Sequence, residues 1–154
     1  MDVKPVIEYY ESGKKQQESW YLNGSLHRID GPAYISYYKS GKVGREIWYY
    51  ESGKVEREFW FVKGNNHRVD SPAIIWYHES GKIGQEEWLF DYQFHRVDGP
   101  AIIDYSESGT IQREVWYLNG KESTHEEWLI ANNLYKPYNT WTDEERVLWS
   151  LSWM

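Results

Sequence analysis

The chain has 154 residues, enough for one domain, and combines ten tryptophans and fourteen tyrosines with a formal net charge of −7. The negative charge disfavours nucleic-acid phosphates and anionic lipid surfaces, and the lack of cysteine excludes disulfides, thiolate metal sites and cysteine nucleophiles. Because no segment approaches the roughly 18 apolar residues of a membrane span, we expect a soluble, intracellular protein without membrane insertion.

A regular series of tryptophans shows that the chain is built from repeats. Six tryptophans follow a glutamate by two residues, in the pairs Glu18/Trp20, Glu46/Trp48, Glu58/Trp60, Glu86/Trp88, Glu114/Trp116 and Glu126/Trp128. Their spacings of 28, 12, 28, 28 and 12 residues define a 28-residue unit with 12-residue inserts at 42–53 and 117–128. Repetition of this kind is typical of a scaffold, since catalysis usually needs one unrepeated constellation.

Within each unit, apolar and polar residues alternate with period 2 and Tyr, Trp, Ile and Val are frequent, which predicts β-strands. Ser-Gly steps predict type I turns with a glycine bulge at 11–14, 39–42, 51–54, 79–82 and 107–110. Asn23-Gly24 and Asn119-Gly120 predict tight two-residue hairpins. The fold class is therefore all-β, an elongated single-layer antiparallel β-meander of repeated hairpins.

The turns also predict a register. A two-residue loop at Asn23-Gly24 places Trp20 opposite His27, and the same arithmetic places Trp60 opposite His67 and Trp88 opposite His95. Each 12-residue insert is expected to add one strand. One added strand reverses the meander, so the turn of His27 should lie at the opposite edge of the sheet from those of His67 and His95.

Alternation along the strands predicts two different faces. One face is expected to carry the glutamates and tryptophans of the ladder. The other is expected to carry Ile35/Tyr37, Ile75/Tyr77 and Ile103/Tyr105, with Arg45, Arg57 and Arg113 nearby. Both faces would then be partly apolar and would need long amphipathic side chains over the aromatic rings.

The end of the chain departs from the repeat. Thr142 and Glu145 form a capping box, and Val147, Leu148 and Leu151 follow as an apolar stripe, which predicts a short C-terminal helix at about 143–152. We therefore divide the chain into a β-repeat domain, 1–130, and a C-terminal capping segment, 131–154.

A second recurring motif, His-Arg-x-Asp-(Gly/Ser)-Pro, begins seven residues after three of the tryptophans. The structural repeat motif comprises Trp20, His27, Asp30 and Pro32, then Trp60, His67, Asp70 and Pro72, then Trp88, His95, Asp98 and Pro100. Segments Trp20–Pro32 and Trp60–Pro72 resemble the MORN-repeat family, in particular the variant repeats abundant in large DNA viruses. The resemblance implies an elongated antiparallel sheet for protein contacts and self-association, in a virion or host cytoplasm if the chain is viral.

Metal and catalytic sites are disfavoured by the repeat geometry. His67 and His95 would lie two strands apart, roughly 10 Å, whereas zinc holds two imidazole nitrogens at about 2.0–2.1 Å from the metal. The ladder of carboxylates offers no environment that would separate two pKa values for glycoside hydrolysis. We expect no metal, no cofactor and no enzymatic activity.

The sequence instead predicts a non-catalytic scaffold that contacts another protein, with a copy of itself as one candidate, as a structural or assembly component. The aromatic candidates for such a contact are Trp60, Trp88, Trp149 and Trp153. The alternative is a nucleic-acid or polyanion-binding module that uses the arginine rows and aromatics. Nucleic acid is the less favoured partner because each tryptophan of the ladder has a carboxylate beside it.

Overall fold

The computed structural model describes residues 4–132, which form fifteen strands and one short helix. The strands are β1 (Val6–Tyr9), β2 (Lys15–Ser19), β3 (Tyr21–Leu22), β4 (Ser25–Leu26), β5 (Tyr34–Tyr37), β6 (Val43–Tyr49), β7 (Val55–Val62), β8 (Asn65–Asn66), β9 (Ile74–Tyr77), β10 (Ile83–Glu87), β11 (Leu89–Phe90), β12 (Gln93–Phe94), β13 (Ile102–Tyr105), β14 (Ile111–Leu118) and β15 (Lys121–Ser123). Helix α1 (His125–Ala131) follows.

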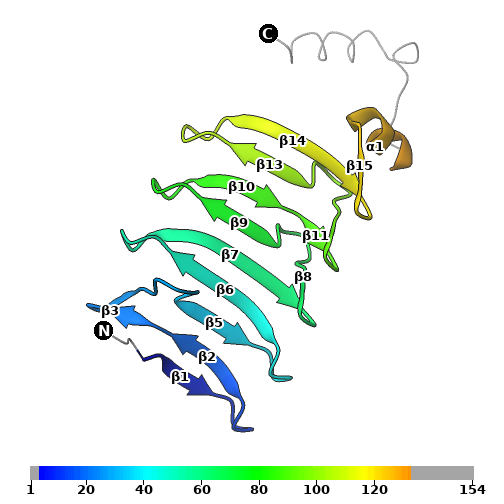
Figure 1. Ribbon diagram of the computed structural model, residues 1–154. Coiled ribbons are helices and arrows are strands. Elements are labelled where there is room, and N and C mark those ends of the chain that lie inside the picture. Colours follow the sequence, from blue (N-terminus) through cyan, green and yellow to red (C-terminus); the bar gives the residue numbers. More distant parts are fainter. Residues whose placement is uncertain (1–3, 133–154) are drawn as a thin grey trace, which may run out of the picture.

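One long antiparallel sheet forms the body of the protein (Figure 1). Its strands follow the order β1-β2-β5-β6-β7-β9-β10-β13-β14-β15, and β8 pairs with the end of β7. Strands β3-β4 and β11-β12 form separate two-stranded hairpins. The predicted all-β meander is confirmed, whereas the helix predicted at 143–152 lies outside the described residues.

The Ser-Gly turns adopt the predicted conformation. In each of them the glycine has a positive φ, between 78° at Gly13 and 92° at Gly41 and Gly109, and the strand register shifts beside the turn. The two-residue hairpins that follow the repeat tryptophans are tighter, with positive φ at both central residues, as at Asn23 (52°) and Gly24 (83°). The pairing of Leu22 with Ser25 confirms the predicted register.

The first 12-residue insert adds strand β6, which lies between β5 and β7. Because β6 reverses the meander, the β3-β4 hairpin extends from one side of the sheet, whereas β8, β11 and β15 extend from the other (Figure 1). The predicted reversal is therefore confirmed for the first insert. The second insert differs, because Trp128 lies in α1 and β15 occupies the place that β8 and β12 occupy in earlier units.

The predicted division of the faces is wrong. Glu18 stands directly opposite Ile35, Glu58 opposite Ile75, and Glu86 opposite Ile103, so the glutamates and isoleucines share a face. Reversal by β6 also turns the motif over. Glu46 lies opposite Ile35, but its neighbour Ile47 lies opposite Glu58, which places the motif of the first unit and those of later units on opposite faces.

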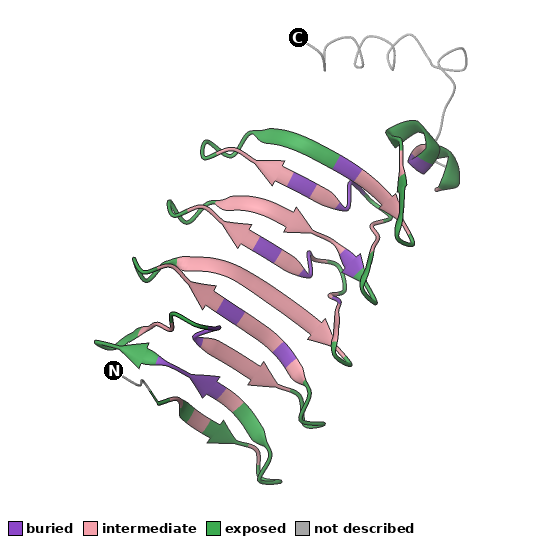
Figure 2. Ribbon diagram, viewed as in Figure 1, coloured by how far each residue is buried: buried purple, intermediate pink, exposed green. Residues whose placement is uncertain are grey.

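Burial is confined to isolated positions, as expected for a single layer of strands (Figure 2). Ile47, Ile75 and Ile103 are buried on the face that carries Glu58 and Glu86. Three alanines that follow the motif prolines, Ala33, Ala73 and Ala101, are fully enclosed, with 0% exposure. A small side chain at this place lets the chain re-enter the sheet close to its neighbours.

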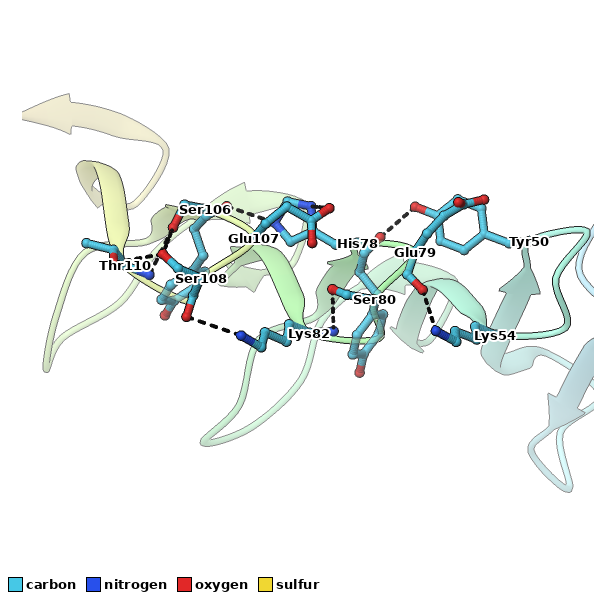
Figure 3. A network of polar contacts seen from close by, with 12 residues as sticks. Tyr50, Lys54, His78, Glu79, Ser80, Lys82, Ser106, Glu107, Ser108 and Thr110 are labelled. Atoms are coloured by element: carbon cyan, nitrogen blue, oxygen red, sulfur yellow. Dashed lines mark hydrogen bonds and ion pairs between the residues drawn. The ribbon is translucent and has the colours of Figure 1, made fainter.

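Side chains connect successive turns along the edges of the sheet. Tyr50 donates to the carbonyl of Tyr77 (2.6 Å) and Lys54 Nζ to that of Glu79 (2.9 Å). One unit later, Lys82 Nζ donates to the carbonyl of Ser108 (3.3 Å), and Figure 3 shows these contacts in one row. Each turn is thereby held to the next, independently of the strand ladder.

Helix α1 was not expected from the sequence. Thr124 caps it and accepts from the Glu127 backbone, and the Glu127 carboxylate accepts in turn from the Thr124 backbone. This capping box, Thr-x-x-Glu, is present in the sequence and has the same form as the one recognised at 142–145. Glu126 and Trp128 also continue the Glu-x-Trp series, which predicts a strand at this place. The division at residue 130 stays a prediction, and α1 runs across it.

The hairpin at Asp91-Tyr92 holds a non-glycine residue in the left-handed conformation. Tyr92 has φ 69°, whereas the corresponding residues Gly24, Gly64 and Gly120 are glycines. Because the left-handed conformation costs an L-residue about 1–2 kcal/mol, and Tyr92 is 60% exposed, Tyr92→Gly should stabilise the protein by about 1 kcal/mol. Thermal unfolding should shift upward by about 2–8 °C. The reverse change, Gly64→Tyr, should lower the midpoint, and equal midpoints for the two variants would contradict this account.

The β6 insertion should be separable from the rest of the fold. Deleting residues 42–53 joins Gly41 to Lys54 and restores 28-residue spacing between Trp20 and Trp60. We expect a folded protein in which the β3-β4 hairpin extends from the same side of the sheet as β8, β11 and β15. Ile29 and Val69, which are 78% and 71% exposed, would then lie roughly 10 Å apart, two strand spacings, instead of at opposite sides of the sheet.

Because the chain has no cysteine, Ile29→Cys and Val69→Cys can be labelled specifically with a donor and an acceptor dye. Energy transfer should be higher in the deletion variant than in the full chain. Equal energy transfer in the folded deletion variant and the folded full chain would show that the insert does not determine the side of the sheet from which the β3-β4 hairpin extends.

Candidate functional site

Three arms project from the sheet, each formed by the hairpin after a repeat tryptophan and the segment leading to the motif proline. Arm 1 spans 21–32, arm 2 spans 61–72 and arm 3 spans 89–100. The backbone of His27 donates to Trp20 (2.9 Å), that of His67 to Trp60 (3.1 Å), and that of His95 to Trp88 (3.0 Å). The predicted opposition of tryptophan and histidine backbones is confirmed.

The side chain that covers each tryptophan is the arginine of the motif and not the histidine. The Arg28 guanidinium carbon lies 4.0 Å from the centre of the Trp20 ring. The same distance is 4.2 Å for Arg68 over Trp60 and 3.8 Å for Arg96 over Trp88. A planar cation over the indole face shields the ring from water while keeping its own charge partly solvated.

The glycine of the motif leaves space for the arginine side chain. A Cβ atom at Gly31 would lie 2.9 Å from the Arg28 guanidinium carbon, and one at Gly99 would lie 3.0 Å from that of Arg96. Neither glycine has a positive φ. Glycine therefore makes room for the arginine that covers the tryptophan, although arm 2 accommodates Ser71 at this position. In arm 3 the same guanidinium donates to the Asp98 carboxylate (2.8 Å).

Two of the motif histidines connect their own arm to the hairpin that follows in the next unit. The backbone N–H of Asp91 donates to Nδ1 of His67 (3.4 Å), and that of Asn119 to Nδ1 of His95 (3.2 Å). The His67 ring also packs 4.5 Å from that of Phe90 and is buried. Sequence reasoning missed this connection because it spans 24 residues. No group of three potential ligands that could hold a metal ion occurs within residues 4–132.

A groove of about 330 Å³ lies between arms 2 and 3. Its lining comprises His67, Arg68, Val69, Asp70, Trp88, Leu89, Phe90, His95, Arg96, Val97 and Asp98. Three apolar side chains in it are well exposed, Val69 at 71%, Phe90 at 55% and Val97 at 58%. Exposed apolar side chains beside positioned polar groups are typical of a binding site for another molecule.

Helix α1 lies on the other side of arm 3, and its Trp128 side chain contacts that arm. Thr124 stands 28 residues after Arg96, so α1 replaces a fourth arm. Trp128 is 3% exposed, and its indole N–H donates to the Arg96 carbonyl (2.9 Å). The ring also packs 4.7 Å from Trp116. The protein thus shows which side chain its own arm accepts: a tryptophan on a helix.

The predicted partner-binding tryptophans differ in their surroundings. Trp60 lies between Arg68 and Arg45, whose guanidinium carbon is 4.4 Å from its ring, so two arginines approach the indole. Trp88 lines the groove. Trp149 and Trp153 lie outside the described residues. Partner binding by these four residues stays a prediction.

The arginine rows are engaged within the sheet. Arg45 forms an ion pair with Glu58 (2.6 Å). Arg57 contacts Trp48, at 4.1 Å from the ring centre, and Trp76, at 5.1 Å. These guanidinium groups cover aromatic rings, which limits their availability for phosphate groups.

Tyrosine hydroxyls pair with the ladder glutamates in each complete unit. Tyr37 donates to Glu18 (2.5 Å), Tyr77 to Glu58 (3.3 Å) and Tyr105 to Glu86 (3.1 Å). Burial, followed by the adjacent carboxylate, raises the pKa of Tyr77 and of Tyr105 to about 12 and that of Tyr37 further. Burial opposes ionisation of Glu18, but hydrogen bonds from Lys15 and Tyr37 hold its pKa below the usual value.

Comparison with known families identifies one segment. Residues 42–59 match the family model of the MORN repeat variant. This MORN-like segment comprises β6, the turn after it and the first half of β7, and it lies between the two segments whose motif resembles the family. Such repeats generally mediate interactions with proteins or membranes and are typically non-catalytic.

No curated protein matches the chain. Nor does any solved structure. Within the described part of the chain, no helix has the length and apolarity needed to cross a membrane.

The glutamate–tyrosine pairs predict a pH dependence at the alkaline end. Because the folded pKa of Tyr77 and Tyr105 lies near 12, above the usual 10, these pairs stabilise the fold fully below about pH 10. That stabilisation is lost as the pH rises toward 12. Absorbance titration of phenolate should reveal late-ionising tyrosines in the folded protein that revert to about pH 10 in denaturant. Replacing both residues with phenylalanine should reduce the late fraction, leaving Tyr37 among the late-ionising groups, and an unchanged late fraction would contradict the assignment.

Proposed function

We propose that the protein is a non-catalytic scaffold that binds a segment of another protein in the groove between arms 2 and 3. The observation that carries this proposal is the packing of α1 against arm 3. There, Trp128 is buried and hydrogen-bonded to the Arg96 carbonyl. Arg68 stands 28 residues before Arg96 and lines the groove, so its carbonyl is the equivalent acceptor on arm 2.

The ligand class follows from the groove lining. Val69, Phe90 and Val97 offer apolar contact, and Arg68 and Arg96 flank it. A partner helix that presents an indole would gain apolar burial and one hydrogen bond, the combination that Trp128 already makes. The partner is therefore a protein segment with an exposed tryptophan or a comparable aromatic donor.

Binding of nucleic acid is the competing proposal, and the geometry supports it less. The guanidinium groups of Arg45, Arg57 and Arg96 lie over indole rings, and Arg45 also pairs with Glu58. Net charge is −7. A further part of the proposal, self-association as a structural or assembly component, concerns surfaces outside the groove. A role in a viral particle or host cytoplasm rests on the sequence resemblance.

The groove can be tested with a peptide of residues 124–132, which carries the α1 capping box and Trp128. Added to isotope-labelled protein, it should shift the amide resonances of arms 2 and 3. A peptide with Trp128→Phe, which lacks the indole donor, should bind less tightly. Val69→Glu should weaken binding by about tenfold or more, because it places a carboxylate in the apolar lining.

Ile29→Glu is the matched control, since Ile29 holds the same position on arm 1 and is 78% exposed, and the hairpin of arm 1 extends from the other side of the sheet. It should leave binding unchanged. Single-stranded DNA is titrated in parallel at about 0.05 and 0.5 M salt, where phosphate binding falls steeply. Salt-sensitive DNA binding together with no shift in arms 2 and 3 would replace this proposal with the nucleic-acid one.

A further inference from the structure

The two ends of the long sheet carry strands that lack one neighbour within the described chain. β1 pairs with β2 on one side only. At the other end, β14 pairs with β13, but β15 covers only its last three residues, Trp116–Leu118. The segment 111–115 of β14 therefore has an open hydrogen-bonding edge. Val6 and Tyr9 are each 57% exposed, and Ile111 is 50% exposed.

Inside the sheet, one pairing rule recurs. The strand with Glu-x-Trp lies beside a strand with Ile-x-Tyr, and the glutamate stands opposite the isoleucine. The pairs are Glu18 with Ile35, Glu58 with Ile75, and Glu86 with Ile103. In each case the tyrosine two residues after the isoleucine donates to that glutamate. Strand type and register are thus specified together.

The two open strands are the two halves of this rule. β1 contains Ile7 and Tyr9, so it is an Ile-x-Tyr strand, and residues 4–132 provide no Glu-x-Trp strand on its other side. β14 contains Glu114 and Trp116, so it is a Glu-x-Trp strand whose following Ile-x-Tyr strand is absent from the described chain, since α1 replaces the fourth arm. Each end presents what the other end would pair with.

We propose that copies of this chain associate head to tail, with β1 of one copy extending the sheet at β14 of another. The internal rule fixes the register, with Glu114 opposite Ile7 of the second copy and Tyr9 of that copy donating to Glu114. Arg113 then stands opposite Glu8 of the second copy. The interface is complementary in charge as well as in strand type, because Arg113, which is exposed and also lies 3.5 Å from the Asp104 carboxylate, stands opposite a glutamate.

This association is open-ended, because two different surfaces meet and each added copy presents a new β14 edge. It is also weak. At the last turn, Ser106 and Thr110 replace the long side chains, such as Tyr50 and Lys54, that hold earlier turns to their neighbours. Strand pairing and the two side-chain contacts of Glu114 and Arg113 would carry the interface without contacts between turns, so assembly should depend on protein concentration. The inference rests on the proposed role in protein contacts but uses a different surface.

Light scattering combined with sizing, over a range of concentrations, tests the interface. The full chain should form a distribution of oligomers that grows with concentration. Glu8→Lys and Arg113→Glu should each raise the apparent dissociation constant about tenfold, because either change places like charges opposite each other. The double variant should regain assembly, since the exchanged charges at positions 8 and 113 are again complementary. An equimolar mixture of the two single variants should also assemble.

Several outcomes would overturn the inference: a full chain that stays monomeric at all concentrations, a closed dimer, or a double variant that is no better than the single ones. A chain ending at Asn132 that assembles when the full chain does not would assign the β14 edge to the chain's own C-terminal segment. Glu122→Lys serves as the control, since this exposed glutamate lies on β15, outside the proposed pairing.

Failure here and failure of the groove proposal are distinguishable. Val69→Glu should block the peptide but leave head-to-tail assembly intact. Glu8→Lys should block assembly but leave peptide binding intact.

Discussion

The fold depends on how aromatic rings are shielded in a sheet that has no second layer. In a sandwich, the rings of one sheet bury against the other sheet. Here the covering atoms come from arginine, with Arg28, Arg68 and Arg96 lying over the tryptophans of their own units. A stacked guanidinium contributes about 0.5–2 kcal/mol, more when it is desolvated. The glutamate two residues before each of these tryptophans accepts a hydrogen bond from a tyrosine, and Glu58 also pairs with Arg45.

The same constraint links the arms to the sheet. Each arm returns over the face that carries its own tryptophan, and glycine at Gly31 and Gly99 leaves space for the guanidinium. His67 and His95 accept from the backbone of the following hairpin, which holds arm 2, arm 3 and the β14-β15 hairpin in a row. The groove arises because this row is held at intervals of two strands, which separates arms 2 and 3 enough to leave about 330 Å³ between them.

Much of this architecture was predictable from the sequence because it is local. Ser-Gly and Asn-Gly steps determined turn type and hairpin register, and the 12-residue spacing of Trp48 and Trp60 predicted the reversal at β6. The faces were not predicted correctly. Alternation within one strand says which residues share a face, but which strands share it depends on the register between strands, as Glu58 opposite Ile75 shows.

The candidate site was less accessible to sequence reasoning. The partner of Trp88 is Arg96 and not His95. The backbone pairing places His95 opposite the tryptophan, but its ring contacts the β14-β15 hairpin. The groove is lined by residues between 67 and 98, and no local sequence pattern predicts that arms 2 and 3 enclose it. Helix α1 could have been found, because Thr124 and Glu127 form a capping box. The 12-residue spacing from Trp116 to Trp128 instead predicted that Trp128 lies in a strand.

The place of β6 in the sheet determines which arms are neighbours on one side and can enclose a groove. Each pair of neighbouring arms on one side can enclose a groove, and α1 fills the place beyond arm 3 with Trp128. Reversal at β6 moves arm 1 to the other side, where it has no neighbouring arm within the described chain (Figure 1). Among residues 4–132, arms 2 and 3 then form the one pair of neighbouring arms on their side, and the place between them is not occupied by α1. A repeat array, which could offer many equivalent sites, thus presents one inter-arm groove flanked by two sheet ends of different type. The groove proposed for a partner and the strand edges proposed for growth of the sheet are separate surfaces of one thin layer.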